Sequence, residues 1–205
     1  MEDWDLYLVT EEDLSAGRKT IDVVKEAVEG GVDVVQLREK NKTTRTKYQL
    51  GKKIKSILEG TGVDFIINDD PALALSLDAD GIHLGDDDLP IRVAREILGP
   101  DKIIGYSTSN LAEIEQAQEA GVDYVGFGAI YQTTSKNVKE RRQAIGLDKL
   151  KKVNEEVKVP IVAIGGINGK NIIEVKEAGA DAVAMISAIT KAKDIKGQVQ
   201  KLKHK

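Results

Sequence analysis

Short, mostly apolar runs alternate with longer amphipathic segments along the whole chain. The runs are rich in valine and isoleucine, a composition typical of parallel strands that are buried on both faces. The sequence predicts such strands over residues 6–9, 34–38, 65–68, 81–84, 103–107, 124–127, 161–164 and 182–186.

The segments between these runs predict helices. Apolar residues recur three and four positions apart, as in Ile21, Val24 and Val28, and this spacing puts them on one helical face. Asn110 stands where a helix cap is expected, and Glu113 follows three residues later as its reciprocal partner. The predicted helices cover residues 20–29, 43–58, 72–77, 91–98, 111–120, 147–156, 170–178 and 195–202.

A glycine-x-aspartate phrase recurs before four of the predicted strands, beginning at Gly31, Gly62, Gly121 and Gly179. The glycine suits the left-handed end of a helix, and the apolar run after it suits a buried strand. We interpret the phrase as a helix-to-strand joint. It therefore describes architecture rather than chemistry.

Eight strands alternating with eight helices predict an α/β fold of the (β/α)8 TIM-barrel type, a closed parallel eight-stranded sheet in a single domain over 1–205. The chain is short for this fold, so its loops must be lean. A doubly wound open sheet is the alternative. Residues 10–19, after the first strand, lack the Gly-x-Gly-x-x-Gly pattern that would bind a dinucleotide there.

The composition is that of an ordinary globular protein, with 41% hydrophobic and 31% charged residues. A net charge of -4 argues against a nucleic-acid partner. The absence of cysteine excludes disulfides, thiolate catalysis and thiolate metal sites. Neither a signal peptide nor an apolar run of membrane-spanning length is visible. We therefore expect a cytoplasmic protein with small-molecule partners and no membrane contact.

Polar residues gather where the predicted strands end, and barrel enzymes carry their working residues at that end. The second strand leads through Gln36, Arg38 and Lys40. Period-two alternation predicts that all three side chains face the barrel mouth. An arginine fork beside a lysine point charge suits a polyanionic ligand.

Acidic clusters follow the third and fourth strands, at 69–70 and 86–88. Acids at neighbouring strand ends suit Mg²⁺, which takes one or two carboxylates together with waters and phosphate oxygens. Residue types alone leave open which aspartates are ligands, because Asp70 and Asp88 also suit helix caps. We interpret His83, between the two clusters, as a packed core residue rather than a base.

The sixth strand is followed by three hydroxyls and an ammonium group, on Thr133, Thr134, Ser135 and Lys136. These groups suit a phosphate-bearing substrate. The charged loop at 137–144 is long for so lean a barrel and predicts a mobile lid.

Two further strand ends suit a monophosphate. Gly166 lies after the seventh strand, and Ser187 lies in a short helical turn after the eighth, where many barrels bind phosphate on backbone amides. No nucleophile with a paired base and no well-placed catalytic histidine is visible. The residues therefore indicate charge stabilisation of a leaving group, as in displacement of a metal-bound pyrophosphate.

Seven ordered segments resemble the thiamine-phosphate synthase (thiamine-phosphate pyrophosphorylase) family over essentially the whole chain. They lie at 7–10, 36–40, 68–70, 81–85, 105–107, 133–136 and 165–167. The resemblance implies a transferase that joins hydroxymethylpyrimidine diphosphate to a thiazole phosphate, carboxylated or not, and releases pyrophosphate. It also implies a pyrimidine-stabilised carbocation, which agrees with the missing general base.

The resemblance implies roles for individual residues. The pyrimidine diphosphate would be held by Gln36, Arg38, Lys40, Asn68, Ser107 and Lys136. The thiazole phosphate would be held by Thr133, Thr134, Ser135, Gly166, Ile186 and Ser187. Asp69 and Asp88 would bind Mg²⁺, and Arg38 and Lys136 would act in catalysis. The family is commonly dimeric, so a homodimer stays open.

Some positions depart from the family's common pattern. Asp86 stands where glutamine is frequent, Ser109 where histidine is common, and Ala129 and Gln132 where prolines often occur. Three alternatives stay open. A thiazole tautomerase paralogue generally lacks the full set of diphosphate and metal residues, an aldolase-type barrel would use Lys136 as a Schiff base, and a phosphate-binding barrel would have no turnover.

Overall fold

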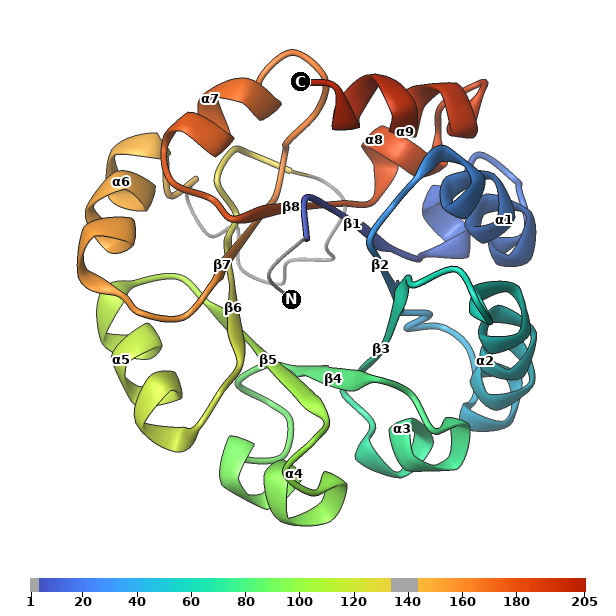
Figure 1. Cartoon of the computed structure of the whole chain (residues 1–205), viewed down its shortest axis with the longest axis horizontal. Helices are drawn as coiled ribbons and strands as arrows, with labels where there is room; N and C mark the ends of the chain where they lie inside the picture. The colour runs from blue at the N-terminus through green and yellow to red at the C-terminus, as the bar shows by residue number, and fades with distance from the viewer. Residues whose placement is uncertain (1–3, 134–143) are drawn as a thin grey trace.

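The computed structural model describes residues 4–133 and 144–205. In these residues eight parallel strands close into a barrel, each paired with the next and β8 paired with β1 (Figure 1). The predicted (β/α)8 barrel is confirmed, and the open-sheet alternative is wrong.

The strands agree with the predicted ones to within one residue at each end. They are β1 (Leu6–Val9), β2 (Val34–Leu37), β3 (Asp64–Asn68), β4 (Gly81–Leu84), β5 (Ile103–Thr108), β6 (Tyr124–Gly128), β7 (Ile161–Ile164) and β8 (Ala182–Met185).

The predicted helices are found to within two residues at each end, outside the strand ring (Figure 1). They are α1 (Thr20–Gly30), α2 (Thr44–Leu58), α3 (Pro71–Leu77), α4 (Ile91–Leu98), α5 (Leu111–Ala120), α6 (Leu147–Glu156), α7 (Ile172–Glu177) and α9 (Ile195–Lys203). The expected helical turn after β8 is α8 (Ser187–Thr190), and a 3-10 turn, η1 (Glu12–Leu14), was not predicted.

Side chains alternate between two cores along each strand. Those that point outward pack under the helices, as Leu6, Leu8 and Val35 do. We call this the outer layer. Those that point inward fill the barrel interior, as Tyr7 and Tyr124 do. The outward side chains of the strands and the apolar faces of the helices bury one another, and this burial supplies most of the driving force for folding.

The recurring glycine-x-aspartate phrase has a two-part structural role. Gly31 and Gly121 end α1 and α5 with φ of 98° and 87°, a conformation that only glycine adopts without strain. The aspartate then binds the start of the preceding strand: Asp33 accepts from two backbone N–H groups where β1 begins. Asp123 and Asp181 of the phrase accept from β5 and β7 in the same way, and Asp80, which follows Asp78-Ala79 instead of a glycine, does so for β3.

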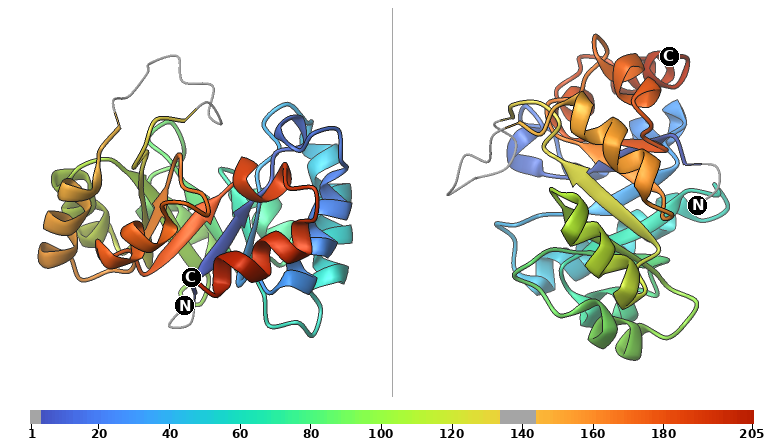
Figure 2. Two further views of the ribbon diagram at one scale, coloured as in Figure 1. Left: turned by 90° about the horizontal axis from the view of Figure 1, so that it is seen from above. Right: turned by 90° about the vertical axis from the view of Figure 1, so that its left-hand side faces the viewer.

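The C-terminal helix α9 covers α1 on the outside of the barrel (Figure 2). Ile195, Val199 and Leu202 are all buried in this contact, as the sequence predicts. Gly30 lets the two helices approach closely, because an added Cβ there would lie 2.7 Å from Val199 Cβ. The lysine-rich end of the chain is thus anchored by an apolar face.

Candidate active site

Asp69 stands at the end of β3 in an unusual backbone conformation. Its φ is 68°, and the bond from Asp70 N to Asn68 O closes a three-residue turn around it. Positive φ is uncommon outside glycine, although aspartate and asparagine tolerate it better than most residues. The Asp69 carboxylate lies 3.2 Å from Lys40 Nζ. Strained backbone of this kind is concentrated at functional sites.

Asp88 faces Asp69 from the loop after β4. Its Oδ2 accepts a hydrogen bond of 2.7 Å from Gly85 N. Burial, and then repulsion from the Asp69 carboxylate, raise the pKa of Asp88 to about 6. Two carboxyl groups in contact cannot both ionise cheaply without a cation between or beside them.

The structure distinguishes the aspartates that could bind a metal from those that serve another role. Asp70 accepts from Leu73 N at 2.9 Å and caps α3, as predicted. The predicted cap role of Asp88 is wrong, because the N-cap of α4 is Pro90, which gives no side-chain cap, and Asp88 accepts from Gly85 N instead. Asp86 accepts from Tyr106 Oη at 3.1 Å. The site acids that meet are therefore Asp69 and Asp88.

A pair of carboxylates fits Mg²⁺, although it is not a complete cage. Among residues 4–133 and 144–205, no three His, Cys, Asp or Glu side chains come together as a metal site. Mg²⁺ often takes one or two protein carboxylates and fills its remaining positions with water and substrate phosphate oxygens. Asp69 and Asp88 therefore fit the number of carboxylate ligands that a protein commonly gives to Mg²⁺.

Arg38, two residues before Lys40 in the chain, is held by an acid of its own. Its Nη1 is 2.6 Å from Glu11 Oε2, and the two side chains are only 10% and 9% exposed. Burial raises the pKa of Glu11, even though the charge of Arg38 opposes the shift. The short ion pair holds the Glu11 carboxylate against the guanidinium group. The guanidinium is thereby fixed in orientation before any ligand arrives.

The period-two argument for Lys40 is wrong. Strand β2 ends at Leu37, and Arg38 N bonds to Thr10 Oγ1 at 3.1 Å, so the chain turns before residue 40. Lys40 reaches the mouth through that turn and meets Asp69 there. Gln36 does point inward, as the alternation predicts, and bonds to Tyr7 in the barrel interior.

Two polar residues that were predicted to bind substrate lie below the mouth, in the barrel interior. Gln36 is 4% exposed and donates to Tyr7 Oη at 2.8 Å. Ser107 Oγ lies 2.9 Å from His83 Nε2, and His83 Nδ1 lies 2.9 Å from Tyr124 Oη. His83 is thus half-buried and held by hydrogen bonds.

The segment after β6 packs on the glycines after β7. Ile130 N and Tyr131 N bond to Ile164 O and Gly165 O at 2.9 and 3.0 Å. A Cβ on Gly166, whose φ is 67°, would lie 2.7 Å from Gln132 O, so only glycine fits here. The Gly128–Ala129 peptide bond is cis.

Part of the predicted phosphate loop lies outside the described residues. Thr133 is described and is half-buried, whereas Thr134, Ser135, Lys136 and the predicted lid up to residue 143 are not. Two more predicted residues follow β8: Ile186 is 7% exposed and precedes α8, and Ser187 is its first residue. Since β7 pairs with β8, these residues follow the strand next to the one that leads into Gly166.

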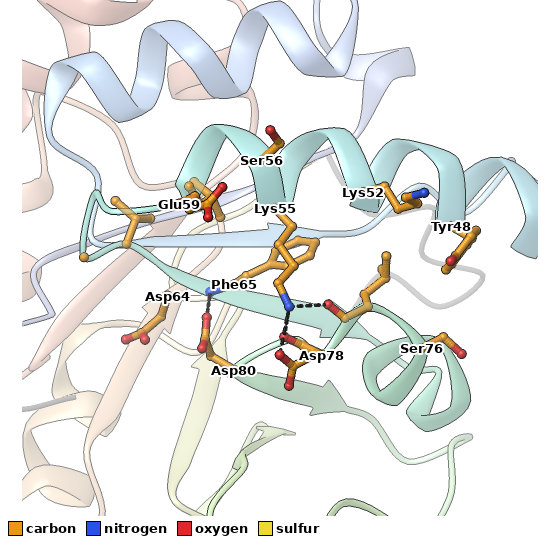
Figure 3. Close-up of a pocket in the computed structure, with 14 residues that line it drawn as sticks. Tyr48, Lys52, Lys55, Ser56, Glu59, Asp64, Phe65, Ser76, Asp78 and Asp80 are labelled. Carbon is orange, nitrogen blue, oxygen red and sulfur yellow. Dashed lines mark hydrogen bonds and ion pairs between the residues drawn. The ribbon is translucent and has the colours of Figure 1, made fainter.

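A groove of about 720 Å³ on the outer surface, between α2 and α3, is a separate feature (Figure 3). It is lined by Asp64 and Asp80, which lie where β3 and β4 begin, so it is at the opposite end of the barrel from Asp69. Lys55 donates there to Leu77 O and to Asp78 at 2.9 Å. Its ammonium group joins α2 to the end of α3, and we assign it no chemistry.

The sequence interpretation missed several residues around the site. Glu11 pairs with Arg38, and the buried carboxylate of Glu39 accepts from Glu12 N and from Thr20 Oγ1 at 2.6 Å. An acidic run directly after the first strand, next to the cations after the second, was an available signal. The interior tyrosines could also have been found, because they share the inward parity of Gln36.

Comparison with known proteins identifies the family of this chain. The model of the family described as thiamine monophosphate synthase matches residues 6–189. The thiamine-phosphate synthase of Haloarcula marismortui is 51% identical over 95% of this chain and 92% of its own length. That of Natronomonas pharaonis is 49% identical over 94% and 90%.

A solved structure shows the same fold at full length. Thiamine phosphate pyrophosphorylase from Pyrococcus furiosus superposes with a TM-score of 0.88 and 39% identity, covering 98% of this chain and 94% of that one. None of the helices formed by residues 4–133 and 144–205 is long and apolar enough to cross a membrane. A match of this extent, in sequence and in structure, establishes that the chain belongs to the thiamine monophosphate synthase family.

Proposed function

We propose that this chain joins hydroxymethylpyrimidine diphosphate to a thiazole phosphate, giving thiamine phosphate and pyrophosphate. The observation that carries the proposal is the contact between Asp69 and Asp88, with Lys40 at 3.2 Å from Asp69. Paired acids beside a cation suit a magnesium diphosphate. The chain's membership of a family of transferases supports the same reaction.

The diphosphate end of the mouth is the cationic side. Arg38 is held in a fixed orientation by Glu11, and Lys40 is half-exposed beside the acids. We assign Gln36, Asn68 and Ser107 to the pyrimidine diphosphate as well, because each lies on an inward position near a strand end. Lys136 completes the set, so charge on the departing diphosphate is met by three cations.

The thiazole phosphate is assigned to the other side of the mouth, where β6, β7 and β8 end. Gly166 and Ser187 follow neighbouring strands, and the chain at Gly166 has no room for a side chain of its own. We assign Thr133, Thr134, Ser135, Gly166, Ile186 and Ser187 to this substrate. The division separates a diphosphate beside the acids from a monophosphate that lies away from them.

We assign Mg²⁺ to Asp69 and Asp88. Bound there, the ion would neutralise the diphosphate and stabilise pyrophosphate as it leaves. The residues of the chain do the rest: Arg38 and Lys136 orient the diphosphate, and the acids hold their position through the turn at Asp69 and the bond from Gly85. A homodimer and a cytoplasmic location stay predictions.

A pyrophosphate-release assay with both substrates tests this function. We expect release only when both substrates and Mg²⁺ are present. Release from the pyrimidine diphosphate alone would indicate hydrolysis, and thiazole turnover without pyrophosphate would indicate the tautomerase paralogue. Substrate binding without any turnover would indicate a binding barrel.

The role of Lys136 can be tested in the same assay. Lys136→Ala should lower turnover about a hundredfold, the usual cost of removing one charge that stabilises a transition state. Lys149→Ala, which removes an exposed charge on α6, serves as the control and should keep its activity. Unchanged turnover in Lys136→Ala would remove this residue from the mechanism.

A further inference from the structure

A continuous chain of hydrogen bonds crosses the barrel interior beneath the mouth. Gln36 Nε2 donates to Tyr7 Oη at 2.8 Å, and Tyr7 Oη lies 2.9 Å from Tyr124 Oη. His83 follows, with Nδ1 2.9 Å from Tyr124 Oη and Nε2 2.9 Å from Ser107 Oγ. The chain thus joins β2, β1, β6, β4 and β5 and ends on two residues assigned to one substrate.

The barrel is shaped to hold this chain. A Cβ on Gly105 would collide with the Tyr124 ring, and one on Gly126 would lie 2.9 Å from His83 Cε1. Trp4 packs edge-on against both tyrosines, with ring centroids 5.6 Å from Tyr7 and 5.2 Å from Tyr124. The glycines leave the space, and the aromatic rings occupy it.

Burial keeps both tyrosines protonated. Tyr7 and Tyr124 are 1% and 0% exposed, and burial raises the pKa of both hydroxyls above its ordinary value. Each hydroxyl therefore has one proton to donate and can accept in return. In a site this dry, a hydroxyl proton without an acceptor is costly.

These bonds have only one consistent direction. Tyr7 accepts from Gln36, so it must donate to Tyr124, which in turn donates to His83 Nδ1. A histidine that accepts at Nδ1 carries its proton on Nε2 and donates to Ser107 Oγ. The reverse direction would give Tyr7 two incoming bonds and leave its own buried proton without an acceptor.

We propose that Tyr7, Tyr124 and His83 are positioning residues that fix which way the Ser107 hydroxyl and the Gln36 amide face. Ser107 accepts from His83, so its own proton is directed to an acceptor on the ligand. Gln36 uses its NH₂ group below, so its carbonyl oxygen accepts from a donor on the ligand. The site then selects a ring that offers both an acceptor nitrogen and an amino group, the pattern of an aminopyrimidine.

The bond made by the Gln36 amide supports this proposal. Among the described residues, no buried side-chain oxygen or nitrogen lacks a hydrogen-bond partner. Gln36 is bonded through its nitrogen to Tyr7, so its carbonyl oxygen is the amide group left to accept from a ligand. The inference rests on the proposed function for the identity of the ligand, but the direction of the chain does not.

The tautomer of His83 tests the direction without any substrate. A long-range ¹H–¹⁵N correlation spectrum of the unliganded protein at about pH 8, where imidazole is neutral, reports which ring nitrogen carries the proton. The sequence has two histidines, so His204→Gln assigns the signals. We expect the Nε2–H form at His83. An Nδ1–H form would reverse the chain and overturn the proposal.

Tyr124→Phe tests the positioning role, because it removes the central hydroxyl and keeps the ring. We expect KM for the pyrimidine diphosphate to rise about five- to tenfold, the effect of one lost buried hydrogen bond, with the thiazole KM within about twofold. The His83 signals should move towards the Nδ1–H form. Tyr48→Phe, on the outer helix α2, is the matched control and should change neither.

Two outcomes would overturn the positioning role: unchanged KM and tautomer in Tyr124→Phe, or equal changes in both KM values. Should that variant not fold, Tyr7→Phe removes the neighbouring hydroxyl and carries the same expectations. A wild-type protein that releases no pyrophosphate would refute the proposed function instead. The tautomer of the unliganded protein would then still decide the direction of the chain.

Discussion

The two ends of the barrel use aspartate in opposite ways. Where the strands begin, Asp33 accepts from two backbone N–H groups of the β1 entry and pairs with Lys203 at 2.6 Å. Where they end, Asp69 faces Asp88 and stands at positive φ. The Asp33 carboxylate accepts from N–H groups that folding would otherwise leave unpaired, whereas the carboxylates of Asp69 and Asp88 repel each other.

The difference shows which acids serve the fold and which serve a ligand. A carboxylate that collects backbone N–H donors stabilises the folded state in every condition where it is ionised. Two carboxylates in contact lower stability until a cation or a proton separates them. Substitutions at the two ends should therefore have opposite signatures, and each of the following changes tests that contrast.

The largest effect is expected where the strands begin. Asp33→Ala leaves two backbone N–H groups and Lys203 without their acceptor, so it should lower the free energy of unfolding by about 3 kcal/mol. Urea unfolding followed by circular dichroism measures this. The turnover of the molecules that remain folded should stay within about twofold of wild type.

The control for Asp33→Ala is Glu155→Ala, which removes an exposed acid on α6 and should change stability by no more than about 0.5 kcal/mol. Equal stability of Asp33→Ala and wild type would mean that water replaces the carboxylate at no cost. The distinction between the two ends would then be lost.

The next effect concerns activity rather than stability. Asp69→Asn removes one charge of the acid pair and keeps a residue that tolerates positive φ. Pyrophosphate release should fall about a hundredfold, or about 2.7 kcal/mol of transition-state stabilisation, and its dependence on Mg²⁺ should weaken. The free energy of unfolding should change little, because the substitution removes both the repulsion with Asp88 and the ion pair with Lys40.

The neighbouring substitution Asp70→Asn is a close control for Asp69→Asn. It makes the same chemical change one residue later, at a cap where asparagine serves as well as aspartate. It should keep wild-type activity. If both variants lose activity equally, the effect belongs to the local charge of this turn and not to Asp69.

The sequence was sufficient for the barrel, because strand and helix periodicities depend on local residue order. The runs at 81–84 and 161–164 were predicted to the residue, and the joints at Gly31 and Gly121 have the left-handed ends that glycine implies. These features involve neighbours in the chain. Period and turn chemistry therefore suffice to find them.

The site was only partly predictable, because its partners come from distant parts of the chain. Nothing near Arg38 in sequence indicates Glu11, 27 residues earlier, and nothing near Tyr7 indicates Tyr124. The alternation argument for Lys40 was wrong because it assumed that the strand continues beyond Leu37. Contacts across a closed barrel follow from strand order and register, which periodicity alone does not give.

The smallest effect is a pH dependence at the mouth. Burial, and then repulsion from Asp69, raise the pKa of Asp88 from 3.8, its ordinary value, to about 6 in the folded protein. Between these values the folded protein holds a proton that the unfolded chain has lost, so stability falls as pH rises through this window. Since Asp88 is only half-buried, solvent screening limits the loss to about 1 kcal/mol.

The comparison of wild type with Asp88→Asn isolates this term from the other titrating groups, because asparagine can still accept from Gly85 N. Without Mg²⁺, the free energies of unfolding of the two proteins should differ least near pH 4. At pH 7 that of the variant should have risen relative to wild type by about 1 kcal/mol. Urea midpoints across that range provide the measurement.

Mg²⁺ at pH 7 should raise the stability of wild type more than that of the variant, since a cation bound at the pair favours both ionised carboxylates. A stability difference that does not vary with pH would show that folding does not change the pKa of Asp88. The acid pair at the mouth would then not lower the stability of the folded protein, and the contrast between the two ends of the barrel would be lost.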